Sequence, residues 1–101
     1  MEIKIIKLSQ NELKFEVIGE SHTLCNLLEK VLLEDESVEM AGYDIPHPLI
    51  ANPIIYIRTR GEKTPEEALR EAVEKILEAK KELKESFEEA LEEWREKSMG
   101  K

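Results

Sequence analysis

The first eighteen residues contain two short runs in which apolar and polar positions alternate. Residues 2–8 (EIKIIKL) are rich in isoleucine, and residues 12–18 (ELKFEVI) place Leu13, Phe15 and Val17 on one face. A period of two is typical of a half-buried strand, and the polar SQN segment between the runs suits a turn. The pattern therefore predicts a β-hairpin.

The spacing of apolar residues changes after Gly19. Between residues 22 and 34 they recur three and four positions apart, as on a helix with one apolar stripe. Ser21 and Thr23 are both suitable N-cap residues. This segment predicts a helix over residues 22–34, and the residues of its stripe are Leu24, Leu27, Leu28, Val31 and Leu32.

Two further strands are predicted after a polar EDES break. They are residues 38–45 (VEMAGYDI) and residues 52–59 (NPIIYIRT), the second of which is rich in β-branched side chains. Two prolines lie between them and fix the backbone of the connecting segment. Arg58 and Arg60 alternate on the second strand, which favours a solvated face over a salt contact to a neighbouring protein.

A long helix is predicted over residues 64–97. Thr64, Pro65 and Glu67 form a strong start signal, with a cap, a proline at the first position and a glutamate three residues after the cap. No helix breaker follows before Gly100. The apolar residues at helical spacing are Leu69, Ala72, Val73, Ile76, Leu83, Phe87, Ala90, Leu91 and Trp94.

The resulting order of elements is β-β-α-β-β-α, which predicts an α/β (α+β) fold. We expect a two-layer sandwich in which one four-stranded sheet carries two helices on one face. A chain of 101 residues is long enough for one domain. Its ββαββ part is expected over residues 1–63, followed by the long C-terminal helix.

The long helix is longer than the sheet that it must cover. About 33 residues of helix span roughly 50 Å, whereas a seven-residue strand spans only about 23 Å. We therefore expect the last third of the helix to overhang its own domain and to expose Leu83, Phe87, Leu91 and Trp94. An apolar patch of this kind indicates an interaction site; the alternative is a frayed acidic tail.

Charge and composition narrow the kind of partner. The net charge is −8, from 23 acidic and 15 basic side chains, and it opposes direct binding to nucleic acid. Cys25 is the only cysteine, and no apolar run approaches a membrane span. We expect a cytoplasmic protein that binds other proteins and no membrane. The abundance of Glu and Lys favours a heat-loving source.

Residues that could carry chemistry are few. His22 and Cys25 lie near a helix N-terminus, where a thiolate can be stabilised, but no third residue is placed to orient such a pair. A small core or interface residue is the preferred interpretation of Cys25. His22, His47 and Cys25 lack the clustered spacing of a metal site, and no phosphate loop is present. We expect no catalytic residues, no cofactor and no metal.

Two segments resemble a known family. The segment HTLCNLLEKVLL at residues 22–33, with its core Thr23-Leu24-Cys25-Asn26, resembles the alpha motif of the alpha-like RNA polymerase subunits. The segment AGYDIPHPL at residues 41–49, with the following NPIIYIRTRGEKTPEEALREA, is similar to the archaeal subunit L family and its small eukaryotic counterparts. The resemblance covers nearly the whole chain.

The resemblance implies a non-catalytic subunit of a DNA-directed RNA polymerase. Such a subunit forms a heterodimer with a larger alpha-like subunit, designated D, which we call the alpha-like partner. The pair is the assembly platform for the large catalytic subunits, with small auxiliary subunits nearby. The expected partner interface consists of Leu24, Asn26, Leu27, Leu28, Val31, Leu32, Leu83, Phe87, Leu91 and Trp94. Ile45, Pro46, His47, Pro48 and Leu49 form either a docking loop or a rigid connection.

Two other classes of function fit the residues less well. Pterin carbinolamine dehydratases share the ββαββα scaffold but use a histidine cluster, and here His22 and His47 lie far apart in the chain. A coiled-coil homodimer requires apolar residues on a strict seven-residue repeat. Lys80 and Ser86 interrupt such a repeat.

Overall fold

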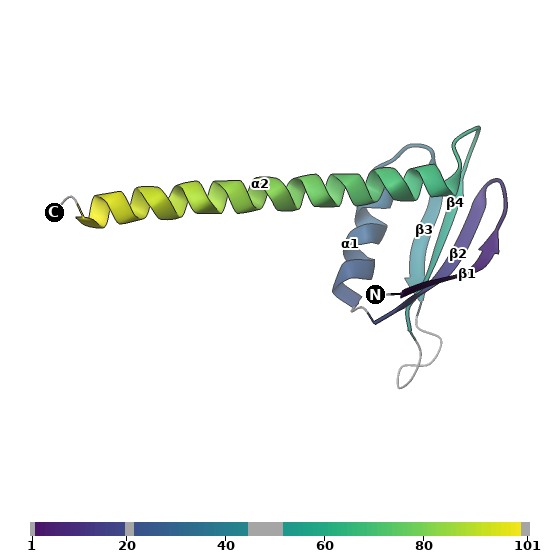
Figure 1. Cartoon of the computed structure of the whole chain (residues 1–101). Helices are drawn as coiled ribbons and strands as arrows, with labels where there is room; N and C mark the ends of the chain where they lie inside the picture. Colours follow the sequence, from purple (N-terminus) through teal and green to yellow (C-terminus); the bar gives the residue numbers. More distant parts are fainter. Residues whose placement is uncertain (1, 20–21, 45–51, 100–101) are drawn as a thin grey trace.

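The computed structural model of the chain describes residues 2–19, 22–44 and 52–99. Within these ranges the element order is β-β-α-β-β-α, as predicted (Figure 1). The four strands are β1 (Glu2–Leu8), β2 (Glu12–Ile18), β3 (Val38–Asp44) and β4 (Ile54–Thr59). The two helices are α1 (His22–Leu33) and α2 (Pro65–Met99). Strand β4 begins two residues later than predicted, directly after Pro53, which has no backbone N–H to donate.

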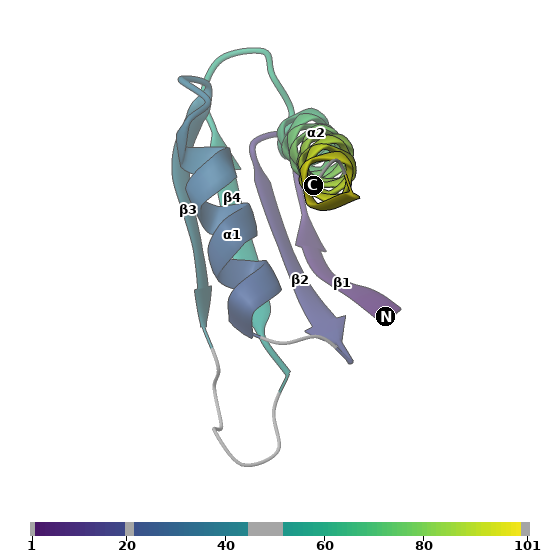
Figure 2. The same ribbon diagram turned by 90° about the vertical axis from the view of Figure 1, so that its left-hand side faces the viewer.

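All neighbouring strands pair antiparallel in the order β1-β2-β4-β3, so the two hairpins meet through β2 and β4. The edge strands β1 and β3 each contain a register irregularity, between Ile5 and Lys7 and between Val38 and Met40. Both helices lie on the same face of this sheet (Figure 2). The predicted two-layer α+β fold is confirmed.

The core lies between the sheet and the first parts of the helices. The alternating residues Leu13, Phe15 and Val17 of β2 are buried on the helix side, together with Ile55 and Ile57 of β4. The helices contribute Cys25, Leu28, Leu32, Ala68 and Ala72 to the same cluster. Since α2 meets the sheet through alanines, its first turns approach the strands closely.

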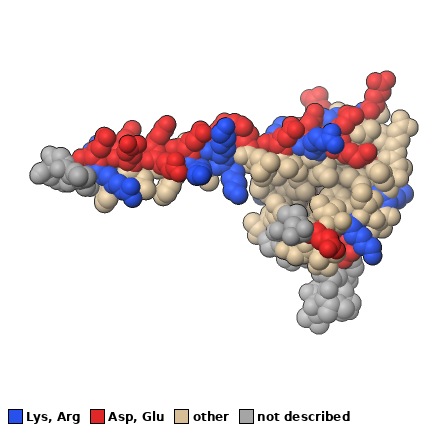
Figure 3. All heavy atoms as spheres, viewed as in Figure 1, with Lys and Arg blue, Asp and Glu red and all other residues tan. Residues whose placement is uncertain are grey.

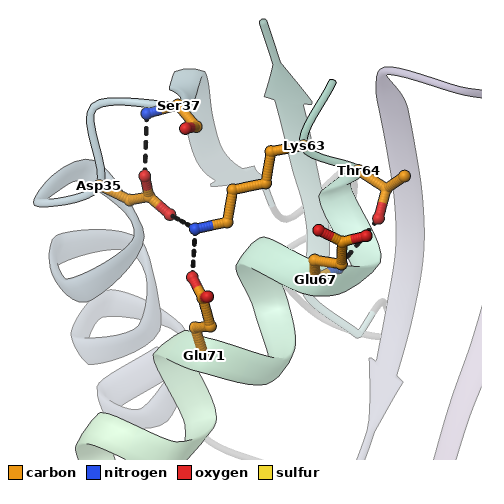
Figure 4. A network of polar contacts seen from close by, with 6 residues as sticks. All are labelled: Asp35, Ser37, Lys63, Thr64, Glu67 and Glu71. Atoms are coloured by element: carbon orange, nitrogen blue, oxygen red, sulfur yellow. Dashed lines mark hydrogen bonds and ion pairs between the residues drawn. The ribbon is translucent and has the colours of Figure 1, made fainter. Parts of the chain in front are cut away.

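The start of α2 has the predicted cap. The Glu67 backbone N–H donates to Thr64 Oγ1 at 3.2 Å, and Pro65 is the first helical residue and is buried (Figure 4). Gly61 precedes this start with a φ of 73°, a conformation that glycine adopts without steric cost. The local sequence therefore fixes where the helix begins.

A lysine links this start to the end of α1. Lys63 Nζ lies 2.6 Å from Asp35 Oδ2 and also contacts Glu71, while the Ser37 backbone N–H donates to Asp35 Oδ1 at 2.8 Å (Figure 4). The hydrogen bonds from Lys63 and Ser37 lower the pKa of Asp35. The same contacts, with Asp35 first and Glu71 second, raise the pKa of Lys63. The network joins the loop after α1 to the start of α2.

Most of α2 does not pack on its own domain. The helix passes over α1 and continues away from the sheet (Figure 1), and every side chain from Leu77 to Ala90 is exposed. The molecule measures 62 × 37 × 17 Å, with a radius of gyration of 18.2 Å. A compact chain of this length has a radius of gyration of about 13 Å. The predicted overhang is present.

Candidate partner interface

The apolar stripe of α1 consists of two rows with different surroundings. Leu28 and Leu32 face the sheet and are buried, whereas Leu27 is 44% exposed and Val31 is half-buried. Leu24 is half-buried and Asn26 is exposed. One row therefore builds the core of this chain, and the other is available to a partner.

The overhanging part of α2 presents large apolar side chains to solvent. Leu83, Phe87 and Trp94 are 71%, 63% and 66% exposed, and Leu91 is half-buried beside them. We call these four residues the α2 stripe. Val73 and Leu77 extend the exposed apolar surface toward the sheet, although the length of the helix predicts exposure only for its last third.

A groove of about 550 Å³ connects these helical surfaces. Its walls come from both helices, and its floor from β2 and β4; we call it the large groove. The residues that line it are Ile3, Phe15, Val17, Leu24, Cys25, Leu28, Ile55, Leu69, Val73, Ile76, Leu77 and Lys80. A second groove of about 340 Å³ lies between the helices themselves, lined by Leu27, Val31, Lys75, Ile76, Ala79, Lys80 and Leu83.

The exposed face of β1 belongs to this surface, and the sequence alone did not reveal it. Ile3, Ile5 and Leu8 pair with Val17, Phe15 and Leu13, whose side chains are buried, yet the three β1 residues are exposed. They border a further groove of about 400 Å³ between β1 and α2. The signal was present in the isoleucine-rich first strand, which has more apolar residues than an uncovered edge strand needs.

Most of the negative charge of α2 lies away from this apolar surface. Carboxylates gather on the side of α2 that faces away from α1 and the sheet, while the side toward them shows uncharged surface interspersed with Lys and Arg (Figure 3). Because charged residues are depleted at the centre of protein interfaces, the side with fewer carboxylates is the side suited to a partner.

The remaining candidate residues are Cys25, His22 and the segment that contains His47. Cys25 is 1% exposed and packs in the core, in agreement with its preferred interpretation. His22 is the first residue of α1, and residues 45–49, including His47, lie outside the described residues, so the docking loop stays a prediction. Across residues 2–19, 22–44 and 52–99, no group of His, Cys, Asp or Glu is arranged to hold a metal ion. No helix in the same ranges is long and apolar enough to cross a membrane.

Known proteins share both the sequence and the fold. The family model for the RNA polymerase Rpb3/Rpb11 dimerisation domain matches residues 12–86. DNA-directed RNA polymerase subunit Rpo11 of Archaeoglobus fulgidus is 49% identical over 72 residues, which cover 71% of this chain and 83% of that protein. Rpo11 of Methanococcoides burtonii is 45% identical over 73 residues, covering 72% and 79%.

A solved structure agrees with these matches over almost the full length. The crystal structure of DNA-directed RNA polymerase subunit L from Thermoplasma acidophilum has a TM-score of 0.83 and 31% identity. The match covers 96% of this chain and 93% of that one, so it includes the long helix. The chain therefore belongs to the Rpo11/L family of DNA-directed RNA polymerase subunits, in which it is a dimerisation domain of the transcription machinery and not a catalytic part.

Proposed function

We propose that this chain forms a one-to-one heterodimer with the larger, Rpb3-like subunit, the alpha-like partner, and that the pair is the platform on which the large catalytic subunits assemble. The surface that pairs consists of the large groove, the exposed row of α1, the α2 stripe and the uncovered face of β1.

The observation that carries the proposal is the continuity of this apolar surface across both helices and the sheet. Monomers seldom expose a contiguous apolar patch larger than a few hundred Å² unless it binds something. Phe87 and Trp94 are side chains of the kind that dominate binding energy when they fill a partner's pocket. Covering them removes this surface from water.

The charge of α2 favours a different chain as the partner over a second copy. Between residues 64 and 97 the sequence has twelve glutamates and only seven Lys or Arg residues. Two such helices placed side by side would bring like charges together, which opposes self-association.

Co-purification tests the proposal. The full-length chain, tagged and expressed with the alpha-like partner of the same organism, should elute as a one-to-one complex and should recruit the large catalytic subunits from an extract. A chain that elutes alone, or only with copies of itself, would contradict the heterodimer. A heterodimer that recruits no catalytic subunit would contradict the platform.

A further inference from the structure

Lys80 has an unusual position on α2, because it lies inside the apolar surface. Of the described residues that line the large groove, only Lys80 is charged. It also lines the smaller groove between the helices, beside Leu27 and Leu83. Its stem therefore lies between the two hollows that a partner must cover.

Lys80 also has no Asp or Glu three or four positions away on its own helix. Side chains three and four positions apart meet on a helix surface, and for Lys80 these neighbours are Ile76, Leu77, Leu83 and Lys84. Every other basic residue of α2 has a glutamate at this spacing. By sequence spacing these glutamates are Glu66 for Arg70, Glu71 for Lys75, Glu85 for Lys81, Glu88 for Lys84, Glu92 for Arg95 and Glu93 for Lys97, and none of the six combinations is an ion pair among the described residues. The described part of the chain gives Lys80 no ion pair elsewhere.

A partner that covers the large groove would remove this ammonium group from water. Burying a charge without an opposite charge or hydrogen-bond acceptors is strongly unfavourable. The other groove residues are apolar and offer no side-chain acceptor. Where the ammonium group itself is buried, compensation must come from the partner.

Taking the proposed pairing as given, we infer that the alpha-like partner presents an Asp or Glu carboxylate to Lys80, and that this ion pair makes Lys80 a specificity-determining residue of the interface. In a second copy of this chain the four residues of the α2 stripe are apolar, so a carboxylate for Lys80 would have to come from outside that stripe. The lysine thus favours a partner whose apolar surface contains an acidic residue. Single polar residues determine the choice of partner in the same way in coiled coils.

A competing arrangement gives the opposite result on mutation. If the long stem instead carries the ammonium group to the rim of the interface, where it stays in water, no carboxylate from the other chain is needed. Replacing Lys80 by the apolar Met would then leave the affinity unchanged or increase it. With a buried ion pair, the same change leaves the opposing carboxylate unpaired and weakens binding.

The test measures the dissociation constant between this full-length chain and the full-length alpha-like partner by titration calorimetry. Lys80→Met should weaken binding by about 30-fold or more, the size expected when one member of a buried ion pair is removed, and Lys80→Glu should weaken it further. Lys81→Met is the matched control, because Lys81 is on the same turn and has Glu85 at helical spacing. Its dissociation constant should stay within about twofold of the wild type, as expected for an exposed residue that lines neither groove.

A charge exchange identifies the opposing group. Single replacement of each Asp and Glu of the alpha-like partner by Lys should yield one variant that binds Lys80→Glu tightly and the wild type weakly. Wild-type binding by Lys80→Met, or the absence of any such exchange variant, would overturn the inference while the heterodimer itself stands. Failure of the two wild-type chains to bind each other would instead overturn the proposed pairing.

Discussion

At the scale of single residues, the adjacent leucines Leu27 and Leu28 of α1 differ in burial and therefore in function. Leu28 is 8% exposed and belongs to the core, whereas Leu27 on the neighbouring row is 44% exposed and lines the groove between the helices. A charge at Leu28 would disrupt the fold of this chain together with any pairing, at a cost of several kcal/mol. A charge at Leu27 tests the interface alone.

We predict that Leu27→Asp leaves the free energy of unfolding within about 0.5 kcal/mol of the wild type, as expected for a surface substitution, and abolishes co-purification with the alpha-like partner. The physical reason is that the new carboxylate is solvated in the free chain and buried in the complex. Lys30→Asp is the control, since Lys30 is exposed on the same helix outside the grooves. Normal recovery of the heterodimer with Leu27→Asp would exclude this row from the interface.

Lys63 permits a prediction about stability and pH. Lys63→Met removes the contacts with Asp35 and Glu71 and should lower the free energy of unfolding at neutral pH by roughly 1 kcal/mol, as for a partly exposed ion pair. The pKa of Asp35 is lowered in the folded chain, so this contribution is complete above the ordinary pKa of 3.8 and is lost as the pH falls through the lowered value. The two proteins should therefore converge in acid.

Urea unfolding of Lys63→Met and wild type at several pH values checks this prediction. Lys81→Met is a suitable control, because Lys81 is exposed on α2, forms no ion pair among the described residues and is not one of the groups that lower the pKa of Asp35. A difference that persists at the same size in strong acid would mean that Lys63 acts through packing and not through Asp35.

At the scale of elements, α2 changes its task along its length. Its first turns bury Ala68 and Ala72 against the sheet, and its later turns carry Phe87 and Trp94 into solvent. Small residues where the helix packs closely and large ones where it does not are the arrangement expected if the later turns pack against another protein.

Truncation after Glu82 separates these two parts. We expect the shortened chain to keep the sheet, because every residue of the buried core precedes Glu82, and to retain a cooperative thermal transition by circular dichroism. Its affinity for the alpha-like partner should fall by at least about 100-fold, since it lacks two aromatic side chains of the kind that form binding hot spots. Equal affinity of the short and full chains would show that the overhang is a solvated tail.

At the scale of the whole molecule, the sequence predicted the fold where local periodicity determines it. The alternation of Leu13, Phe15 and Val17, the leucine spacing of α1 and the cap at Thr64 each specify an element and its buried face. The length of α2 also predicted the overhang, because helix rise and strand rise are fixed quantities.

Other features depend on how distant segments meet, and periodicity carries no information about that. The contact of Lys63 with Asp35 joins two loops, and the exposure of Ile3 and Ile5 depends on which strands the helices cover. The leucine spacing of α1 likewise predicts two neighbouring rows but does not determine which row faces the strands. The position of Lys80 between two grooves needed the same three-dimensional information.

The extended shape of the free chain leads to the last prediction, which concerns Trp94. This side chain is the only tryptophan, it is 66% exposed, and it lies five residues before the end of α2 at Met99. Its fluorescence should shift to the blue when a tryptophan-free variant of the alpha-like partner is added, because the ring leaves water for an apolar contact. The non-pairing Leu27→Asp variant should show no shift under the same conditions, which controls for nonspecific effects. If emission stays unchanged while the two wild-type chains elute together, the end of α2 lies outside the interface, and pairing must then rely on the large groove and the surfaces next to it.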